Sequence, residues 1–277
     1  MYQITKREQL SPGVVRMVVH APRVAKKALP GQFIILRVEE NGERIPLTIS
    51  DYDRDAGLVS IVFQEVGRTT KLLGAKQEGD ALPTFVGPLG KPSHLEGIRR
   101  AAVIGGGLGT AIAYPQAKAL FEAGAHVDVI AGFRSKDLII LEDELKKAAT
   151  NVYITTDDGS NGHKGFVTDV LRSLLEKGEK YDEVIAIGPL PMMKFVSKLT
   201  KEYGIKTTVS MNPVMIDGTG MCGGCRLTVG GETKFACVDG PDFDGHLVDF
   251  DEAMRRNAMY KQQEREADCR LMNKEAE

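Results

Sequence analysis

The stretch Ala101-Ala-Val-Ile-Gly-Gly-Gly-Leu-Gly-Thr110 decides the fold. Its apolar start predicts a buried strand, its glycines predict a tight turn, and residues 111–123 predict a helix that ends at Gly124. Proteins bind the pyrophosphate of a dinucleotide at such a turn, because the free N–H groups of the first helical turn point at the anion. Taken alone, the glycines are also compatible with close packing of a strand against a helix.

Strands and helices alternate through residues 98–210, which predicts a doubly wound parallel sheet with helices on both faces. Ligands of such sheets bind at the carboxyl ends of the strands. Further strands are expected at 127–130, 152–155, 184–187 and 206–210, and further helices at 141–149, 165–177 and 192–203.

The preceding region, residues 1–97, is rich in branched apolar residues between Gly, Pro and Asp, which predicts short strands and a small antiparallel β-barrel. A helix is expected at 69–75, directly after Gly67, where its free N–H groups would face an anion. The strands are expected at 14–20, 32–38, 47–50 and 58–65.

The third region, residues 211–250, holds the run Asp217-Gly-Thr-Gly-Met-Cys-Gly-Gly-Cys225, and Cys237 follows it. Plant-type ferredoxins place the cysteines of a [2Fe–2S] cluster as C-x4-C-x2-C with a distant fourth. Here a carboxylate takes the first position, so Asp217, Cys222, Cys225 and Cys237 are the expected cluster ligands. A zinc loop is the alternative, because Cys-x2-Cys is also a zinc half-site and Asp binds zinc. A hairpin is expected over 226–236, and residues 251–277 form a charged tail with helical propensity that is solvated or docks on a partner.

Composition excludes several classes of function. The chain of 277 residues has 36 basic and 38 acidic residues and a formal net charge of -2, without the basic surplus that phosphate backbones select. We therefore expect no nucleic-acid partner. The sequence has neither a signal peptide nor an apolar run of the roughly 18–20 residues that span a bilayer, so we expect a cytoplasmic protein without membrane contact.

Together, the motifs resemble the ferredoxin–NADP reductase superfamily. They follow one another along the chain as R-x-P-L-T from Arg44, G-R-T-T from Gly67, the turn Gly87–Pro92, the glycine turn 105–110 and the cysteine loop. Within that superfamily the chain resembles the electron-transfer subunit of dihydroorotate dehydrogenase. It is still more similar to the small subunit of NADH-dependent ferredoxin:NADP oxidoreductase, also called sulfide dehydrogenase.

The resemblance divides the chain into an FAD-binding barrel (1–97), an NAD(P)-binding domain (98–210), a [2Fe–2S] domain (211–250) and a tail that docks on a partner (251–277). It implies that Arg44 and the helix start after Gly67 hold the FAD diphosphate and that the residues after Arg44 border the flavin ring. The flavin contacts implied in this way are Arg44, Pro46, Leu47, Thr48, Phe63, Gln64, Glu65, Val66, Gly67, Thr69 and Thr70.

By the same resemblance, the glycine turn and the ends of the following strands hold the nicotinamide nucleotide. The implied contacts are Gly107, Leu108, Gly109, Thr110, Arg134, Asp157, Asp158, Gly188 and Pro189. The resemblance favours NADH. The residues leave NADPH open, because Arg134 and Lys136 are able to meet a 2′-phosphate whereas the acidic run 142–144 would disfavour one.

The function implied is that of an oxidoreductase subunit whose chemistry is carried by its cofactors, so no catalytic side chain is expected. It would pass electrons from NADH through FAD to the cluster, within a heterodimeric, electron-bifurcating ferredoxin:NADP oxidoreductase. A larger subunit with further flavin and iron–sulfur clusters would handle ferredoxin and NADP(H).

Two alternatives remain from the sequence. The first is a dihydroorotate dehydrogenase electron-transfer subunit, although those subunits carry four cysteines and Asp217 departs from that pattern. The second is a zinc-binding interaction protein without catalysis. Cys269 lies outside the loop and is expected to be a free thiol or a partner contact.

Overall fold

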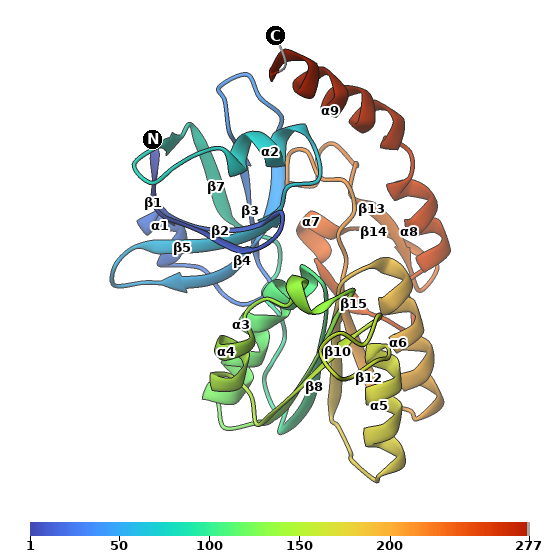
Figure 1. Ribbon diagram of the computed structural model, residues 1–277. Coiled ribbons are helices and arrows are strands. Elements are labelled where there is room, and N and C mark those ends of the chain that lie inside the picture. Colours follow the sequence, from blue (N-terminus) through green and yellow to red (C-terminus); the bar gives the residue numbers. More distant parts are fainter. Residues whose placement is uncertain (276–277) are drawn as a thin grey trace.

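The structure, a computed structural model, describes residues 1–275 and contains three β-sheets within them (Figure 1). The barrel lies above the α/β sheet in this view, and the C-terminal segments lie beside both. The predicted fold class, an antiparallel barrel followed by a parallel α/β sheet and a small C-terminal cluster region, is confirmed.

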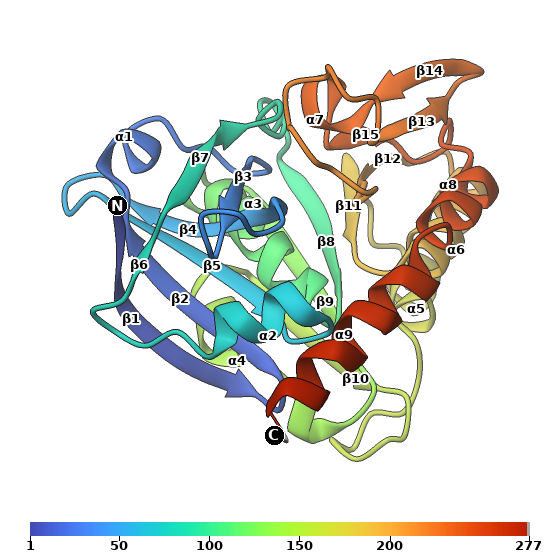
Figure 2. The same cartoon turned by 90° about the horizontal axis from the view of Figure 1, so that it is seen from above.

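The first sheet has seven antiparallel strands in the order β6-β1-β2-β5-β4-β3-β7. Its two edge strands, β6 and β7, are separated in the chain by Pro83 alone, so the sheet comes round on itself into a nearly closed barrel (Figure 2). The elements of this part are β1 (Tyr2–Ser11), β2 (Val14–His20), α1 (Pro22–Ala25), β3 (Phe33–Arg37), β4 (Ile45–Asp53), β5 (Leu58–Gln64), α2 (Arg68–Gly74), β6 (Ala81–Leu82) and β7 (Thr84–Leu89).

The second sheet has the strand order β10-β9-β8-β11-β12-β15, in which β15 is antiparallel and the other strands are parallel. Helices α3 and α4 cover one face, and α5 and α6 cover the other (Figure 1). The elements are β8 (Arg100–Gly106), α3 (Gly109–Glu122), β9 (His126–Phe133), a 3-10 turn (Lys136–Leu138), α4 (Glu142–Lys147), β10 (Asn151–Thr156), α5 (Val167–Glu176), β11 (Glu183–Ile187), α6 (Leu190–Glu202) and β12 (Lys206–Ser210).

The C-terminal segments return to both sheets. The hairpin β13–β14 forms the third sheet, whereas β15 pairs with β12 and thus extends the α/β sheet. Helix α9 reaches back to the barrel, where the Lys71 Nζ donates to the Asp268 carboxylate at 2.7 Å (Figure 2). The elements are β13 (Arg226–Val229), β14 (Glu232–Phe235), α7 (Ala236–Asp239), β15 (Asp242–Asp244), α8 (Phe250–Asn257) and α9 (Lys261–Glu275).

Every strand and helix expected from the sequence is present with its ends shifted by a few residues, but four strands were not anticipated. Strand β1 carries mostly polar residues because much of its surface faces solvent, and Ile4 is its fully buried apolar side chain. Strands β6 and β15 are too short for a period to show, and β15 contains two Asp residues, which are depleted in strands. Strand β7 contains Gly87 and Pro88, which are typical of turns.

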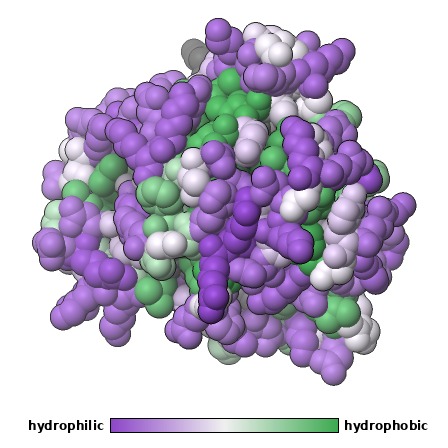
Figure 3. Space-filling model, turned by 90° about the horizontal axis from the view of Figure 1, so that it is seen from below, coloured by the Kyte–Doolittle hydropathy of each residue, from purple (hydrophilic) through white to green (hydrophobic). Residues whose placement is uncertain are grey.

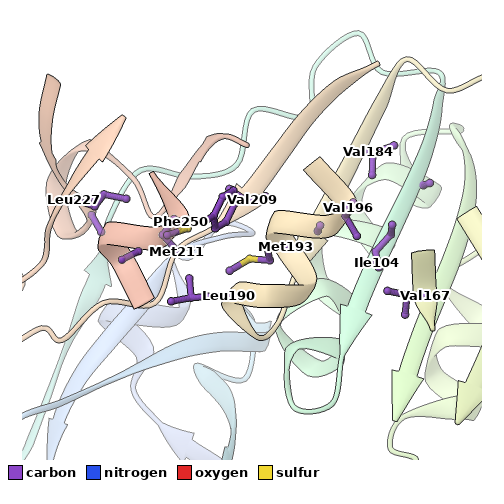
Figure 4. Packing of buried hydrophobic residues seen from close by; sticks show 14 of the residues in the cluster. Ile104, Val167, Val184, Leu190, Met193, Val196, Val209, Met211, Leu227 and Phe250 are labelled. Carbon is purple, nitrogen blue, oxygen red and sulfur yellow. The ribbon is translucent and has the colours of Figure 1, made fainter. Parts of the chain in front are cut away.

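One hydrophobic core joins the α/β sheet to the C-terminal segments. Figure 4 shows it running from Val167 and Ile104 past Met193 to Val209, and onward to Leu227 and Phe250. All of these side chains are buried. The segment that carries the cysteines therefore shares a hydrophobic core with the α/β sheet and is not a separately packed domain.

A polar network ties the amino-terminal ends of the parallel strands together, at the edge opposite to the glycine turn. Asp128 is 1% exposed, and its carboxylate accepts a hydrogen bond of 2.7 Å from the Tyr181 hydroxyl and one of 2.7 Å from the Asn151 amide. Burial and the adjacent Asp128 raise the pKa of Tyr181, so its hydroxyl stays protonated and donates. Asp128 therefore joins neighbouring strands through hydrogen bonds inside the sheet.

The surface is mostly hydrophilic when seen from below, and hydrophobic residues emerge in smaller areas between charged ones (Figure 3). In the part of the chain that the structure describes, no helix combines the length and the apolar character that a membrane span requires.

We expect Tyr181→Phe to lower the free energy of unfolding by about 1–3 kcal/mol, because it leaves an oxygen of the buried Asp128 without its donor. Urea unfolding measures this change. Tyr203→Phe is the matched control, since Tyr203 is 43% exposed, and it should have no measurable effect. Equal effects of the two substitutions would contradict a role for the Tyr181 hydroxyl.

Candidate functional site

A cleft of about 690 Å³ opens where the barrel meets the carboxyl ends of β8, β9 and β11. Its walls come from three parts of the chain: the barrel, the α/β sheet, and the segment that leads from β12 to the cysteine loop. The sequence predicted flavin contacts in the first part, nucleotide contacts in the second and cluster ligands after the third. These three parts of the chain meet at the cleft, and the expected cluster ligands follow just outside its wall.

The glycine turn shapes the floor of this cleft. Gly109, the first residue of α3, lies against the carbonyl oxygen of Ile187 and against Gly188, so a Cβ at this position would overlap the backbone of β11. Only glycine allows this approach. The Thr110 and Ala111 amides at this helix start donate to the carbonyls of Gly107 and Leu108, at 3.1 and 3.0 Å. The amides that remain for an anion in the cleft, within the described residues, are those of Leu108 and Gly109.

The predicted flavin contacts fall into three groups in the structure. Pro46, Thr48, Gln64 and Val66 line the cleft. Phe63 instead is 1% exposed in the barrel core. The remaining ones, Arg44, Leu47, Glu65, Gly67, Thr69 and Thr70, lie outside the cleft wall, and the last three form the start of α2.

Helix α2 begins at a local cap. The Thr70 hydroxyl accepts hydrogen bonds from the amides of Val66 and Gly67, both at 3.1 Å. The Thr69 hydroxyl donates to the Glu43 carboxylate across the loop between β3 and β4. This helix start and the loop opposite it therefore face each other at the predicted diphosphate position.

The predicted nucleotide contacts are also divided. Gly107, Leu108, Gly109, Arg134, Gly188 and Pro189 line the cleft. Thr110 is fully buried, and its hydroxyl has no hydrogen-bond partner within the described residues. Asp157 and Asp158 lie in the next loop, where their amides donate to the carbonyls of Phe133 and Arg134.

Several cleft residues were not found from the sequence. They include Ser11 and Phe33 of the barrel, residues 210–213 and Met215 before the cysteine loop, and Pro241 before β15. No local motif marks these positions. Ser11 and Phe33 reach the cleft through the closure of the barrel, and Ser210 and Pro241 reach it through the pairing of β12 with β15. The sole signal was the position of 210–215 between two predicted sites.

The cysteine loop begins two residues after the cleft wall ends at Met215, which is at most about 7 Å of extended chain. The Cys225 and Cys237 sulfurs are 3.2 Å apart and buried, whereas Cys222 is exposed. Burial and the Cys225 thiol raise the pKa of Cys237 to about 12. Amide N–H groups point at the sulfurs, from Gly224 to Cys222 and from Cys237 to Cys225, both at 3.5 Å.

The two buried sulfurs of this loop lie close enough to bind one iron of a di-iron cluster. Among the side chains that the structure describes, no three of His, Cys, Asp or Glu converge on one point. A [2Fe–2S] cluster instead divides its ligands between two irons, and the adjacent Cys225 and Cys237 sulfurs fit one of them.

Asp217 closes the loop through its backbone contacts. One carboxylate oxygen accepts from the Thr219 amide at 3.0 Å and the other from the Cys222 amide at 2.9 Å. These bonds, that from Thr219 first, lower the pKa of Asp217. The side chain is therefore anionic and held toward Cys222.

Residues of the barrel contact the backbone of this loop. The Arg44 guanidinium donates to the carbonyls of Ile216 at 2.9 Å and Asp217 at 3.2 Å. Gly218, which has a φ of 75°, lies against Ile35 and Leu89 of the barrel, where a side chain would not fit. Arg44, predicted to hold the FAD diphosphate, is thus also a contact between the flavin segment and the cluster loop.

Comparison with known proteins agrees with this geometry. Residues 103–198 match the model of the oxidoreductase NAD-binding domain, and residues 212–249 match the iron–sulfur cluster binding domain of dihydroorotate dehydrogenase B. An uncharacterized protein of Clostridium beijerinckii is 58% identical over 275 residues, which cover 96% of this chain and 93% of that protein. The homolog of the dihydroorotate dehydrogenase B (NAD(+)) electron transfer subunit in Thermotoga maritima is 47% identical and covers 95% of this chain and 93% of its own length.

The chain belongs to the family of dihydroorotate dehydrogenase B electron-transfer subunits and their homologues. Among solved structures, a chain of the NADH-dependent reduced ferredoxin-NADP oxidoreductase has a TM-score of 0.92 and 45% identity and covers 98% of both chains. The ferredoxin–NADP reductase type of fold is thereby confirmed.

Membership of this family makes the chain an oxidoreductase and implies FAD, an iron–sulfur cluster and NAD(H) as its cofactors. The match of residues 212–249 to an iron–sulfur domain favours the di-iron interpretation of the loop over zinc. The relatives are named as subunits, so the family implies a larger partner.

We expect Arg44→Ala to loosen the cysteine loop, because the backbone of Ile216 and Asp217 loses a charged donor. Hydrogen–deuterium exchange of residues 216–224 should become about tenfold faster, which corresponds to a lost contact of about 1.4 kcal/mol. Arg37→Ala is the control on the same sheet, since the Arg37 guanidinium donates to the Glu40 carbonyl instead. Unchanged exchange in Arg44→Ala would show that the loop stands without the barrel.

Proposed function

We propose that the chain is the electron-transfer subunit of a heterodimeric, electron-bifurcating NADH-dependent ferredoxin:NADP oxidoreductase, and that it oxidises NADH through FAD to a [2Fe–2S] cluster. One observation carries the proposal: a single cleft of about 690 Å³ collects walls from the barrel, the glycine turn and the lead-in to the cysteine loop. The 45% identity and TM-score of 0.92 to a chain of such an oxidoreductase support the choice of enzyme.

The barrel residues would bind FAD. Pro46 and Thr48 on β4 and Gln64 and Val66 at the end of β5 would border the ring, because they form the barrel wall of the cleft. The start of α2 and Arg44 would neutralise the diphosphate. The remaining implied contacts are Leu47 on β4, Phe63 on β5 and Glu65 directly after β5.

The α/β sheet would bind the nicotinamide nucleotide. The first turn of α3 would meet the pyrophosphate with its N–H groups, while Gly188 and Pro189 would face the nicotinamide across the cleft from Thr48. Arg134 and the loop that holds Asp157 and Asp158 would meet the adenosine half. We propose NADH as the nucleotide on the strength of the family likeness.

Asp217, Cys222, Cys225 and Cys237 would bind the cluster. The adjacent Cys225 and Cys237 sulfurs suit one iron, and Asp217, held toward Cys222 by an amide, suits the other together with Cys222. The N–H groups directed at the sulfurs would tune the cluster potential.

When bound, FAD turns the two electrons of a hydride into single electrons, and the cluster carries them one at a time. The chain itself contributes binding, orientation and the short path from the cleft wall at Met215 to the cluster ligand Asp217. The proton that arrives with the hydride would leave through the cleft to solvent once both electrons have passed on.

The proposed partner is a larger flavin and iron–sulfur subunit that handles ferredoxin and NADP(H). The exposed Cys222 and the exposed apolar side chains of Ile216 and Met221 support this proposal, because a partner would have access to the cluster at this surface. Purification from native cells tests the heterodimer. Full turnover by the isolated monomer would contradict it.

A dihydroorotate dehydrogenase electron-transfer subunit is the second candidate, because relatives with that name are 30–36% identical to this chain. Orotate-linked NADH oxidation by the native complex would select it, whereas NADH-dependent reduction of ferredoxin and NADP would select the first proposal.

We expect the chain, purified under anaerobic conditions, to show the optical spectrum of a flavin and, after NADH is added, the EPR signal of a reduced [2Fe–2S] cluster. NADPH should reduce both more slowly. A preparation with equimolar zinc, and without flavin or acid-labile sulfide, would refute electron transfer by this chain.

We expect Asp217→Ala to lose or destabilise the cluster while FAD stays bound, because the loop loses an anionic ligand and two amide contacts. Asp217→Cys should restore a cluster with an altered EPR spectrum. Glu232→Ala, which removes an exposed carboxylate from the nearby hairpin, is the control and should keep the cluster. An unchanged cluster in Asp217→Ala would remove Asp217 from the ligands.

A further inference from the structure

Asp242 is a partly buried residue whose carboxyl group points into a closed junction, and the proposed electron path does not use it. Its Oδ2 accepts a hydrogen bond of 2.6 Å from the Ser93 hydroxyl and a long one of 3.4 Å from the Gln116 amide. Its Oδ1 is sealed from solvent and has no hydrogen-bond partner within the described residues.

This carboxyl lies where three parts of the molecule meet. Ser93 belongs to the connection between barrel and α/β sheet, and Gln116 lies on α3, the helix of the glycine turn. Asp242 itself lies on β15, opposite Ser210 of β12. On the barrel side, a Cβ at Gly31 would meet the Asp242 carboxylate at 3.2 Å.

The same junction supports the cleft wall. Ser210 and Pro241, the strand partner and the chain neighbour of Asp242, both line the cleft. The Met211 amide donates to the Pro241 carbonyl at 2.9 Å, and the Lys91 amide donates to the Gly240 carbonyl at 2.7 Å. The Asp242 carboxyl thus lies between the cleft wall and the connection.

Two buried oxygens of the junction lack a hydrogen-bond donor among the described residues, namely the Gln116 carbonyl oxygen and the Asp242 Oδ1, and Gln116 is fully buried. An ionised carboxylate only accepts hydrogen bonds, whereas a protonated one also donates. A proton on Asp242 would supply the donor that the junction lacks and remove a buried charge without a counterion.

We propose that Asp242 is a proton-binding latch: its neutral carboxyl holds the barrel connection, α3 and the cleft wall together, and its ionisation loosens them. Asp242 is thus a positioning residue, acting on the site through Ser210 and Pro241.

The charges around Asp242 agree with this assignment. Burial raises the pKa of Asp242 to about 6, and the carboxylate of Glu183 adds to the effect. Glu183 is itself buried and paired with Lys206 at 2.8 Å. No cation is among the groups that shift the pKa of Asp242. The other groups that face Asp242, namely Ser93, Gln116 and Ser210, are neutral.

The sign of the pH effect follows from the raised pKa. In the unfolded chain Asp242 loses its proton near the ordinary value of about 3.9. Between about pH 4 and pH 6 the folded chain holds a proton that the unfolded chain has lost, so this group makes the protein less stable as the pH rises through that window. Above about pH 6 both states are ionised and the effect stays constant.

The first test compares Asp242→Asn, which mimics the neutral carboxyl, with the wild-type chain in its cofactor-loaded form. The unfolding constant of the wild type, divided by that of Asp242→Asn, should increase on the order of 100-fold between pH 4 and pH 7. Above pH 7 this ratio should stay level. Asp244→Asn, two residues away on the exposed face of β15, is the matched control and should leave a nearly flat ratio. A flat ratio for Asp242→Asn would overturn the proposal.

The second test detects the proton itself. The infrared band of protonated carboxyl groups that is missing from Asp242→Asn should titrate near pH 6. A band for Asp242 that titrates near the ordinary value of about 4 would refute the latch.

The third test measures positioning. After correction for intrinsic rates, hydrogen–deuterium exchange of residues 90–95 and 210–215 should be several-fold faster at pH 7.5 than at pH 5.5 in the wild type and pH-independent in Asp242→Asn. Equal pH dependence in the two proteins would show that Asp242 is buried but does not control the cleft wall.

Discussion

The contact between Gly109 and the backbone of Ile187 is the constraint on which the site depends. Because a Cβ has no room there, α3 starts directly against the end of β11, and its first turn points into the space between barrel and sheet. The carboxyl ends of β8 and β11 then form one wall, which the barrel closes from the other side. One close backbone approach thus sets the position of the helix start in the wall of the cleft.

The shared core extends this constraint to the cysteine loop. Val209, Met211, Leu227 and Phe250 are buried in the same cluster as the inner side chains of α6 (Figure 4). The distance from cleft to loop is therefore set by packing of the native interior and not by a flexible linker. Electron transfer benefits from such fixed spacing, since the donor and the acceptor need not search for each other.

Local patterns in the sequence were sufficient for the layered fold and for the motifs, because a buried parallel strand, a glycine turn and a cysteine spacing are each visible within about ten residues. Strands β6 and β15 escaped, since two or three residues carry no period. Ser210, Pro241 and Asp242 escaped for a different reason. Their roles arise from the antiparallel pairing of β12 with β15, which joins residues about thirty positions apart and leaves no local signal.

Asp217 and Arg44 show how one substitution in a motif reorganises its surroundings. A carboxylate has two oxygens that each accept an amide, and Asp217 uses both, for Thr219 and for Cys222. A thiolate offers a single, weaker acceptor atom. The backbone carbonyls of Ile216 and Asp217 accept hydrogen bonds from the Arg44 guanidinium of the barrel. The aspartate thus gives the loop a fold of its own before any metal ligation is considered, and it does so at the point where the barrel, and with it the flavin segment, touches the loop.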